Sequence, residues 1–461
     1  MLNIITQKTQ DSDKILSSVD DFYSTFNLSS AARKSNMTKM KGIPFRVLFT
    51  YLICTIFSNQ SAYRNHLMNK DELSFSDKTF RNLLNDGRIN WSKFMCLLSS
   101  TIWSYITPLT SNDRKSAFVI DDTMYVRENA KKVELAAMQH DHATKGKNKY
   151  KKGFKQLMLG ITDGATFLPV NFSLQSGKNK VAQAKEFDGR SNAFKRRAKA
   201  QRKATDVAIE LLQEALKYGV KANYVLFDSW FSSPVMLKKI NDLKLFTVCM
   251  LKKTTTHHYL FEGKMQDVKT IFSKCRKRRG RSRYLLSVEV MAVVDRQEIP
   301  VKLVYVRNRN KRNEYLVLAS TDIQLTENEI IELYGKRWSI EVYFKMCKSH
   351  LRLGKYQGIS YDGIFAHSVI VMVGYMILAV KHRQETDDRT IGDLFYLLVT
   401  ELSDISFAEA IQLLLNLFRD ALESEKHLDE KIINGFLSQF LEYLPAHYKN
   451  RFIEVKKTSY S

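Results

Sequence analysis

Hydrophobic positions in the first quarter of the chain recur at helical spacing. From residue 11 to about residue 110, apolar residues are separated by three or four positions, as in Phe45–Leu52 and from Trp91 to Trp103. This period places them on one face of an α-helix. The pattern therefore predicts a helical N-terminal domain over residues 1–112.

The pattern changes at residue 117, where short continuous apolar runs replace the helical period. Ala117–Ile120 is such a run and ends at Asp121, and Tyr224–Phe227 is a second run and ends at Asp228. Runs of this kind are typical of strands that are buried on both faces. Two more strands are expected around the turn signal Asp163-Gly164, and a helical pattern precedes the second run. The sequence therefore predicts an α/β domain.

A β-rich segment interrupts this domain before helical patterns return. Apolar runs at residues 284–294, 301–306 and 315–320 predict strands, and helix formers dominate after residue 326. The apolar run at residues 368–380 is shorter than the roughly 18 to 20 residues of a membrane span. It favours a buried core helix, so no membrane association is expected. We expect four parts: helical residues 1–112, α/β residues 113–251 with 322–384, a β-rich insertion at residues 252–321, and helical residues 385–461.

The charge of the chain indicates an anionic partner. Its 461 residues contain 72 Lys plus Arg and 48 Asp plus Glu, a formal net charge of +24, and 44% of them are apolar, which excludes general disorder. Between residues 385 and 445, thirteen acidic residues face only four basic ones. The basic excess therefore lies elsewhere and favours nucleic acid, whereas the acidic C-terminal part suits a protein contact such as a dimer partner. A dense basic run includes Arg276, Arg278 and Arg279.

Cysteine usage and the N-terminus favour a cytoplasmic protein. The five cysteines show no metal-binding or disulfide spacing, which is typical of reduced thiols. Residues 1–10 lack the charged and apolar segments of a signal peptide.

The two aspartates that end apolar runs are candidate metal ligands. Side chains at the carboxyl ends of neighbouring parallel strands converge on one edge of a sheet. Mg²⁺ prefers oxygen ligands and often needs only one or two carboxylates. Taken singly, however, Asp121 and Asp228 are better explained as residues that end a strand or begin a turn than as metal ligands.

A third element adds a polar stripe between apolar flanks. Tyr334, Arg337, Glu341 and Lys348 stand at offsets 0, 3, 7 and 14, which fall within one narrow sector of a helix at about 100° per residue. Lys345 lies on the same stripe. An ordinary charged helix face is the alternative interpretation. The stripe suits a helix laid across a cleft, where the glutamate reaches a metal ion and the basic residues reach phosphates.

The motif Tyr334-x2-Arg337-x3-Glu341-x6-Lys348 resembles the YREK signature of the insertion sequence 4 family of bacterial transposases, a branch of the DDE recombinases. The order of an early aspartate, a later aspartate, a β-rich insertion and a glutamate helix is also similar. The resemblance covers about residues 116–353. It implies an RNase-H-like catalytic domain in which Asp121, Asp228 and Glu341 hold two Mg²⁺ ions, with Mn²⁺ as a substitute.

The first of these acids has two candidates. A D-x-T pattern runs through Asp121, whereas an aspartate immediately before Thr123 would favour Asp122. Neighbouring residues of a strand point to opposite faces, so only one of the two can face the site. We favour Asp121 and keep Asp122 as the alternative.

The resemblance also implies the activity and the partners. It implies a bacterial, nucleoid-associated enzyme that cleaves the ends of an insertion element by metal-dependent hydrolysis and joins them to target DNA, working as a homodimer. Two rivals remain: a related nuclease that does not transpose, and a noncatalytic DNA-binding protein. The residues expected to contact DNA are Tyr334, Arg337, Lys345, Lys348, Arg276, Arg278 and Arg279.

Overall fold

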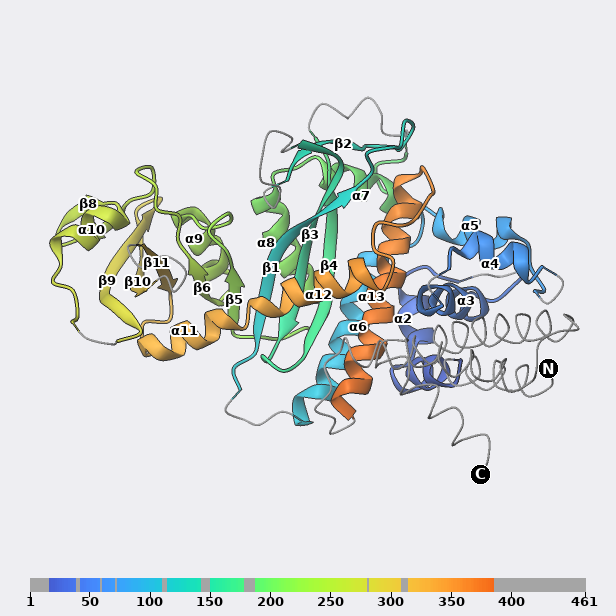
Figure 1. Ribbon diagram of the computed structural model, residues 1–461, viewed down its shortest axis with the longest axis horizontal. Helices are drawn as coiled ribbons and strands as arrows, with labels where there is room; N and C mark the ends of the chain where they lie inside the picture. The colour runs from blue at the N-terminus through green and yellow to red at the C-terminus, as the bar shows by residue number, and fades with distance from the viewer. Residues whose placement is uncertain are drawn as a thin grey trace, which may run out of the picture. The chain divides into compact units, whose positions relative to one another are not determined.

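The computed structural model describes residues 16–38, 42–58, 60–70, 73–109, 114–141, 150–177, 187–279, 282–307 and 314–384. All of these belong to one compact unit, residues 16–391. The expected C-terminal helical domain, residues 385–461, lies outside the described residues. Figure 1 shows helices and a large sheet, so the mixed α/β class expected from the sequence is confirmed.

The N-terminal part is helical, as its periodicity predicts. Asn90 begins α6 by accepting a hydrogen bond from the backbone N–H of Lys93 at 3.0 Å. The buried face of α6 packs against β4 and against α13, while α3 and α5 also pack against α13. The helices of this part are α2 (Leu28–Lys34), α3 (Phe45–Phe57), α4 (Ala62–Met68), α5 (Asp77–Leu84) and α6 (Trp91–Ile106).

One mixed sheet of eleven strands runs through the described residues, with the order β2-β3-β1-β5-β6-β11-β10-β9-β7-β8 and with β4 paired to β3. The first strands form an antiparallel group in which β3 pairs with β1, β2 and β4. Their bounds are β1 (Ala117–Val126), β2 (Ala137–His140), β3 (Tyr150–Thr162) and β4 (Phe167–Gln175).

The β3–β4 connection is the hairpin that the Asp163-Gly164 signal predicts. The Asp163 carboxylate accepts hydrogen bonds from the backbone N–H groups of Ala165 and Thr166 at 2.9 and 2.7 Å. Gly164 adopts a φ of +99°, a conformation that side chains other than glycine rarely take. All nine residues of β4 are buried, and Pro169 lies beside a register shift in the ladder, where its missing N–H does no harm.

Two parallel strands extend the sheet on the other side of β1. The helices α7 (Asn192–Ala200) and α8 (Ala204–Lys217) lead from β4 to β5 (Tyr224–Phe227), which runs parallel to β1. The helix α9 (Pro234–Asp242) then leads to β6 (Phe246–Met250), which is parallel to β5. Both α7 and α8 pack against β4.

The β-rich segment continues this sheet, because β11 pairs with β6. Its long strands β9 and β10 form an antiparallel ladder, and β10 pairs in turn with β11. The elements are β7 (Tyr259–Phe261), β8 (Lys264–Gln266), α10 (Val268–Lys274), β9 (Tyr284–Val294), β10 (Gln297–Arg307) and β11 (Tyr315–Ser320).

Three helices complete the unit: α11 (Glu327–Gly335), α12 (Trp338–Ser349) and α13 (Tyr361–Gln384). In Figure 1, α12 crosses the sheet, and it contacts β1, β4 and α13. Residues 361–383 are long and apolar enough to cross a membrane, but 94% of their apolar window is buried inside the protein. The helix α13 is thus a core helix, as expected for its apolar run.

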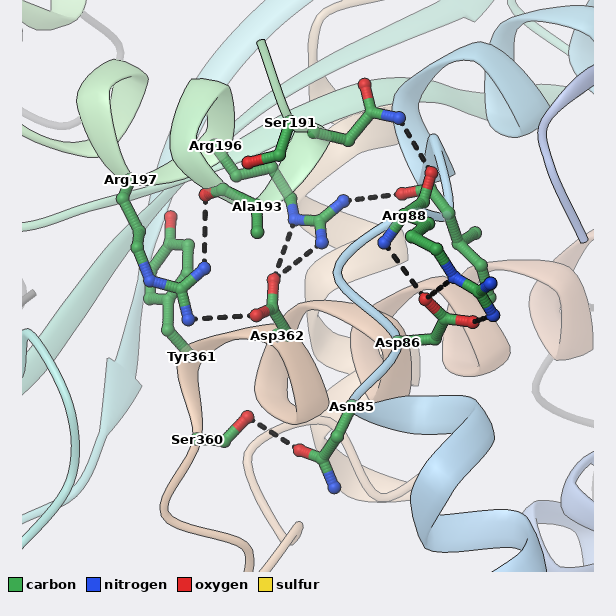
Figure 2. A network of polar contacts seen from close by, with 12 residues as sticks. Asn85, Asp86, Arg88, Ser191, Ala193, Arg196, Arg197, Ser360, Tyr361 and Asp362 are labelled. Atoms are coloured by element: carbon green, nitrogen blue, oxygen red, sulfur yellow. Dashed lines mark hydrogen bonds and ion pairs between the residues drawn. The ribbon is translucent and has the colours of Figure 1, made fainter. Parts of the chain in front are cut away.

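A buried ionic network fastens α13 to α7 (Figure 2). Arg196 donates to Asp362 from Nε at 3.1 Å, and Nη2 of Arg197 lies 2.8 Å from the same carboxylate. Arg197 also donates two hydrogen bonds to Glu134, at 2.7 and 2.9 Å. Nη1 of Arg196 reaches the Ile89 carbonyl at 2.7 Å, so the network includes the segment before α6. Each buried guanidinium here has a carboxylate partner, which offsets its desolvation.

Candidate active site

The parallel ladder between β1 and β5 brings Asp121 and Asp228 side by side. The expectation that the first strand ends at Asp121 is wrong, because β1 continues to Val126 through its pairing with β3. In the β1–β5 ladder Ile120 pairs with Phe227, so the next residue of each strand is an aspartate at the same level. The Asp228 carboxylate accepts a hydrogen bond from the backbone N–H of Trp230 at 2.9 Å, which fixes the turn after β5. The structure thus brings together the two aspartates that the apolar runs single out.

Arg337 joins Asp121 to Glu341. Its Nη1 donates to Asp121 Oδ2 at 3.0 Å, and its Nη2 donates to the carboxylate of Glu341. The Arg337 guanidinium also lies 5.8 Å from the centre of the Tyr334 ring. Three residues of the helical stripe therefore meet at the edge where β1 carries its aspartate.

The charge balance of this edge is unusual. Burial raises the pKa of Asp121 to about 7, while Arg337 opposes the rise and the negative charge of Asp228 adds to it. The backbone N–H of Asp122 donates to Asp121 Oδ1 at 2.8 Å. A raised pKa means that the surroundings disfavour the ionised carboxylate, because nearby positive charge does not compensate for burial and for the neighbouring negative charge. The edge therefore favours the arrival of a cation.

Asp122 belongs to a different environment. Its Oδ2 lies 3.3 Å from Nζ of Lys155 on β3, and the Lys155 ammonium is 5.2 Å from the centre of the Trp230 ring. Alternation along β1 directs Asp121 and Thr123 toward α12 and Asp122 away from it. Lys155 ends the basic stretch at residues 145–155, whose composition suits phosphate contacts, but no local pattern predicts its pairing with Asp122.

The two lysines of the stripe differ in their surroundings. Lys348 donates from Nζ to Thr123 Oγ1 at 2.6 Å. Desolvation by nearby protein atoms lowers the pKa of Lys348, even though part of the side chain keeps contact with solvent. Lys345 is exposed and lies beside His350. Burial lowers the pKa of His350, and the positive charge of Lys345 lowers it further. Only Lys348 is therefore tied to the strand that carries Asp121.

The stripe lies on two helices, and the expectation of one continuous helix is wrong. Gly335 ends α11, and α12 begins at Trp338. At the junction, the backbone N–H groups of Lys336 and Arg337 bond to carbonyls only three residues earlier, the pattern of a tight turn. Glycine has a low helix propensity, which explains the position of the break. Arg337 thus stands at the start of α12, one turn before Glu341.

The basic run of the insertion lies apart from the carboxylates. Arg276, Arg278 and Arg279 are exposed in the segment between α10 and β9. The Arg278 backbone N–H bonds to the Leu285 carbonyl of β9 at 2.7 Å, and its side chain donates to the Tyr284 hydroxyl. Among the described residues, no hydrogen bond or ion pair joins this run to Asp121, Asp228 or Glu341.

The donor set can be tested for its fit to a metal ion. Among the described residues, no three acidic, histidine or cysteine side chains are gathered so that they could hold one. The neighbouring oxygens of Asp121 and Asp228 nevertheless suit a hard divalent cation, which often takes one or two protein carboxylates and completes its shell with water and phosphate. In the described arrangement Arg337 provides the positive charge beside Asp121 and Glu341.

Comparisons with known proteins match the part of the chain that contains the two aspartates. A family model described as "DDE superfamily endonuclease" matches residues 67–309, just over half of the chain, and ends before Arg337 and Glu341. No curated protein sequence matches the chain. The structure titled "Drosophila P element transposase strand transfer complex" is similar at 13% sequence identity and a TM-score of 0.23. That match covers 54% of each chain, so this chain spans about half the length of the one it matches.

Proposed function

The chain belongs to the DDE superfamily endonucleases, and from this membership we propose that it is a DNA transposase of the insertion sequence 4 type. The enzyme cleaves the ends of an insertion element and joins them to target DNA. The observation that carries the proposal is the junction of Asp121, Arg337 and Glu341 beside Asp228. Arg337 links the aspartate on β1 to the glutamate on α12, and Asp228 follows the neighbouring strand, which is the order expected of the YREK branch.

The order of elements supports an RNase-H-like catalytic domain. An antiparallel group of strands passes into two parallel strands, and helices connect β4 to β5 and β5 to β6. The β-rich insertion then separates Asp228 from the helix that carries Glu341. In this order Glu341 comes after the insertion, and Arg337 links it to Asp121 on β1.

We assign the three carboxylates to the binding of divalent metal ions, Mg²⁺ in the cell and Mn²⁺ as a substitute. Such ions supply Lewis-acid stabilisation of the reacting phosphate and activation of a water or hydroxyl nucleophile. Asp121 and Asp228 provide neighbouring oxygens from rigid strands, and Glu341 provides a third from α12. Because burial and Asp228 raise the pKa of Asp121 to about 7, this carboxyl loses its proton when positive charge arrives.

The basic side chains of the stripe hold the DNA backbone next to these acids. Arg337 offers a planar guanidinium that can bind a phosphate through two hydrogen bonds, and Lys348 acts as a point charge. Tyr334 packs beside Arg337 and limits its orientations. Exposed Lys345 and the run Arg276, Arg278 and Arg279 extend the basic surface along the DNA.

The partners follow from the charge and the reaction. The net charge of +24 suits DNA, comprising the terminal inverted repeats of the element and the target. Joining two ends requires two copies of the enzyme in one complex, so we propose a homodimer with the acidic C-terminal residues as its contact. The N-terminal helices are assigned to sequence recognition, and the enzyme is placed in the bacterial cytoplasm at the nucleoid.

A cleavage and joining assay tests this function. Duplexes carrying the inverted repeats that flank the gene are incubated with Mg²⁺ or Mn²⁺ and target DNA. We expect wild-type protein to produce cut ends and joined products, and Asp228→Asn and Glu341→Gln to lose at least about 4 kcal/mol of transition-state stabilisation, roughly a thousandfold in rate. Unchanged cleavage by either variant would sink the catalytic assignment.

The matched family description names an endonuclease, which makes a nuclease without transposition the second candidate. Metal-dependent cleavage of both strands without joined products would establish it. Salt-sensitive DNA binding without any cleavage would identify a noncatalytic DNA-binding protein instead. Lys217→Gln, an exposed charge change at the end of α8, is the matched control for all variants.

A further inference from the structure

A cavity of about 570 Å³ opens where β1 ends, next to the proposed active site. One wall is the end of β1 and the residues that follow it, from Met124 to Ala130. The other wall is the end of α12 and the segment after it, with Lys348, Lys355 and Gln357. The size is in the range of cavities that hold small molecules or parts of larger ligands.

The cavity carries positive charge without a matching carboxylate. Arg127, Lys348 and Lys355 line it, and among the described residues none of the three forms an ion pair with an acidic side chain. Glu128 is the acidic residue of the lining, and its side chain is exposed. The walls therefore favour an anion.

Arg127 is half-buried and differs from Arg196 and Arg197, which are buried. The Nε and Nη2 atoms of Arg127 are covered by protein and make no hydrogen bond within 3.5 Å to any described residue, although the guanidinium lies near enough to the Tyr125 hydroxyl to oppose the rise in the pKa of that group. By contrast, Arg196 and Arg197 are both paired with Asp362 (Figure 2). Buried donors without a partner cost free energy. A hydrogen bond to an acceptor in the cavity would therefore stabilise the Arg127 guanidinium if it turned toward the cavity.

The groups behind Arg127 do not supply that acceptor as an anion. Burial and the positive charges of Arg127 and Arg352 lower the pKa of His367 to about 3, and burial raises the pKa of the Tyr125 hydroxyl to about 12. Both groups are therefore neutral at physiological pH. The Arg127 guanidinium lies 5.4 Å from the centre of the Tyr125 ring, so the tyrosine supports it through its face.

The position of the cavity relates it to the carboxylates. Lys348 lines the cavity and also bonds to Thr123, which lies two residues beyond Asp121 on the same face of β1, about 7 Å along the strand. A polymer held at Asp121 would therefore pass directly into this space.

We propose that the cavity binds a phosphodiester of the DNA backbone adjacent to the one that is cut, with Arg127, Lys348 and Lys355 as its ligands. The inference rests on the proposed function and deepens it. Arg127 accounts for the specificity of the site, because its fork of donors matches two phosphate oxygens, while the lysines add charge. A sugar and its phosphate together suit the volume better than a lone inorganic anion.

Salt-dependent binding to a short fluorescein-labelled DNA duplex tests the site, with no need for the element's own ends. Each phosphate contact contributes about −0.9 to the slope of log affinity against log salt concentration. We expect Arg127→Gln and Lys355→Gln each to make the slope less steep by about 0.9 and to weaken binding roughly 10-fold at low salt. Lys217→Gln is the charge-matched control, and Arg127→Lys should restore the slope but only part of the affinity.

The outcomes separate this inference from the proposed function. Slopes for Arg127→Gln and Lys355→Gln equal to that of Lys217→Gln would overturn the site, and exposed Lys355 keeps this test valid if Arg127→Gln folds poorly. If inorganic phosphate raises the Tm of wild type and not of Arg127→Gln while the slopes stay equal, the cavity takes a free anion and not DNA. Cleavage is measured in parallel. If the Arg127→Gln and Lys355→Gln variants show a less steep salt dependence but the wild-type protein never cleaves DNA, the phosphate site in the cavity is supported and the catalytic function is rejected. If cleavage occurs and Asp228→Asn abolishes it, but the salt dependence of all variants is unchanged, only the phosphate site is rejected.

Discussion

Arg337 donates a hydrogen bond to Asp121 across 3.0 Å, although the two residues are 216 positions apart in the chain. The same guanidinium also bonds to Glu341, so one cation serves two carboxylates from different elements. It thereby holds β1 and α12 together beside Asp228. The ionisation of Asp121 should therefore affect the stability of the protein, the rate of cleavage and the pH dependence of that rate.

Asp121→Asn should stabilise the protein at alkaline pH while removing its activity. Burial raises the pKa of Asp121 to about 7, whereas an unfolded aspartate titrates near about 3.9. Between these values the folded protein keeps a proton that the unfolded chain has lost, so the contribution of Asp121 to stability falls as pH rises. We expect the variant to gain at most about 4 kcal/mol in its free energy of unfolding at about pH 8, and almost nothing below about pH 4.

Urea denaturation at several pH values checks this prediction, with Asp122→Asn as the neighbouring control. Addition of Mg²⁺ should stabilise wild type more than Asp121→Asn, because the ion needs the ionised carboxylate. An equal gain for Asp121→Asn at acidic and alkaline pH would contradict the raised pKa.

Cleavage assays should distinguish the two candidates for the first acid. Asp121 meets Arg337 and follows the register of Asp228, whereas Asp122 is paired with Lys155 at 3.3 Å. We expect Asp121→Asn to reduce cleavage at least about a hundredfold, which corresponds to about 3 kcal/mol, and Asp122→Asn to reduce it less than about tenfold. The opposite ranking would transfer the catalytic role to Asp122.

Replacement of Arg337 should move the pH dependence of cleavage. Arg337 opposes the rise in the pKa of Asp121, so Arg337→Gln raises that pKa further and a higher pH is needed to ionise the carboxyl. We expect the acidic limb of the pH–rate profile to shift upward by about one unit and the rate to fall at least about tenfold. Arg337→Lys keeps the charge and should keep the limb in place while the rate still falls. Identical limbs in wild type and Arg337→Gln would disprove the coupling.

The ionic network of Figure 2 should contribute to stability through Asp362. Burial alone would raise the pKa of Asp362, but Arg196 and Arg197 outweigh it and hold the pKa below its usual value. Asp362→Asn leaves two buried guanidinium groups short of a partner and should lower the free energy of unfolding by about 3 kcal/mol or more at neutral pH. The difference should narrow as pH falls below about 4, because the unfolded chain then binds a proton at Asp362 that the folded protein takes up only at lower pH.

The control for this network is Arg88→Gln, which breaks an exposed pair with Asp86 in the same region. Its effect should stay within about 1 kcal/mol, since solvent screens exposed charges. Equal losses in the two variants, measured by urea denaturation, would argue against a special role for the buried pair.

The strands were predictable because their signals are local. Ala117–Ile120 and Tyr224–Phe227 are apolar runs that end in aspartate, and both are strands of the sheet. The Asp163-Gly164 turn depends only on neighbouring residues and a glycine at positive φ. The helical stripe brought Arg337 and Glu341 together for the same reason, since residues four apart share a helix face.

Other features depend on contacts that no local pattern encodes. The pairing of Arg196 with Asp362 joins residues 166 positions apart, and Lys155 reaches Asp122 only because β3 lies beside β1. Arg127 stands in an ordinary turn, and only the walls of the cavity set it apart. The break between α11 and α12 at Gly335 could not be predicted from the spacing of the stripe. Spacing on a helical wheel reports which residues share a face, and it does not report whether the backbone hydrogen bonds continue through every residue.

The unbroken ladder from β5 to β9 sets a length scale for the substrate. The basic segment with Arg278 is bonded to β9, and four strand spacings separate β9 from β5, whose end carries Asp228. At about 4.8 Å for each spacing, that separation is roughly 20 Å. Because every intervening strand is hydrogen-bonded to its neighbours, the insertion cannot swing away without breaking the sheet. A DNA segment held at Arg278 would therefore keep a constant lateral distance from Asp228.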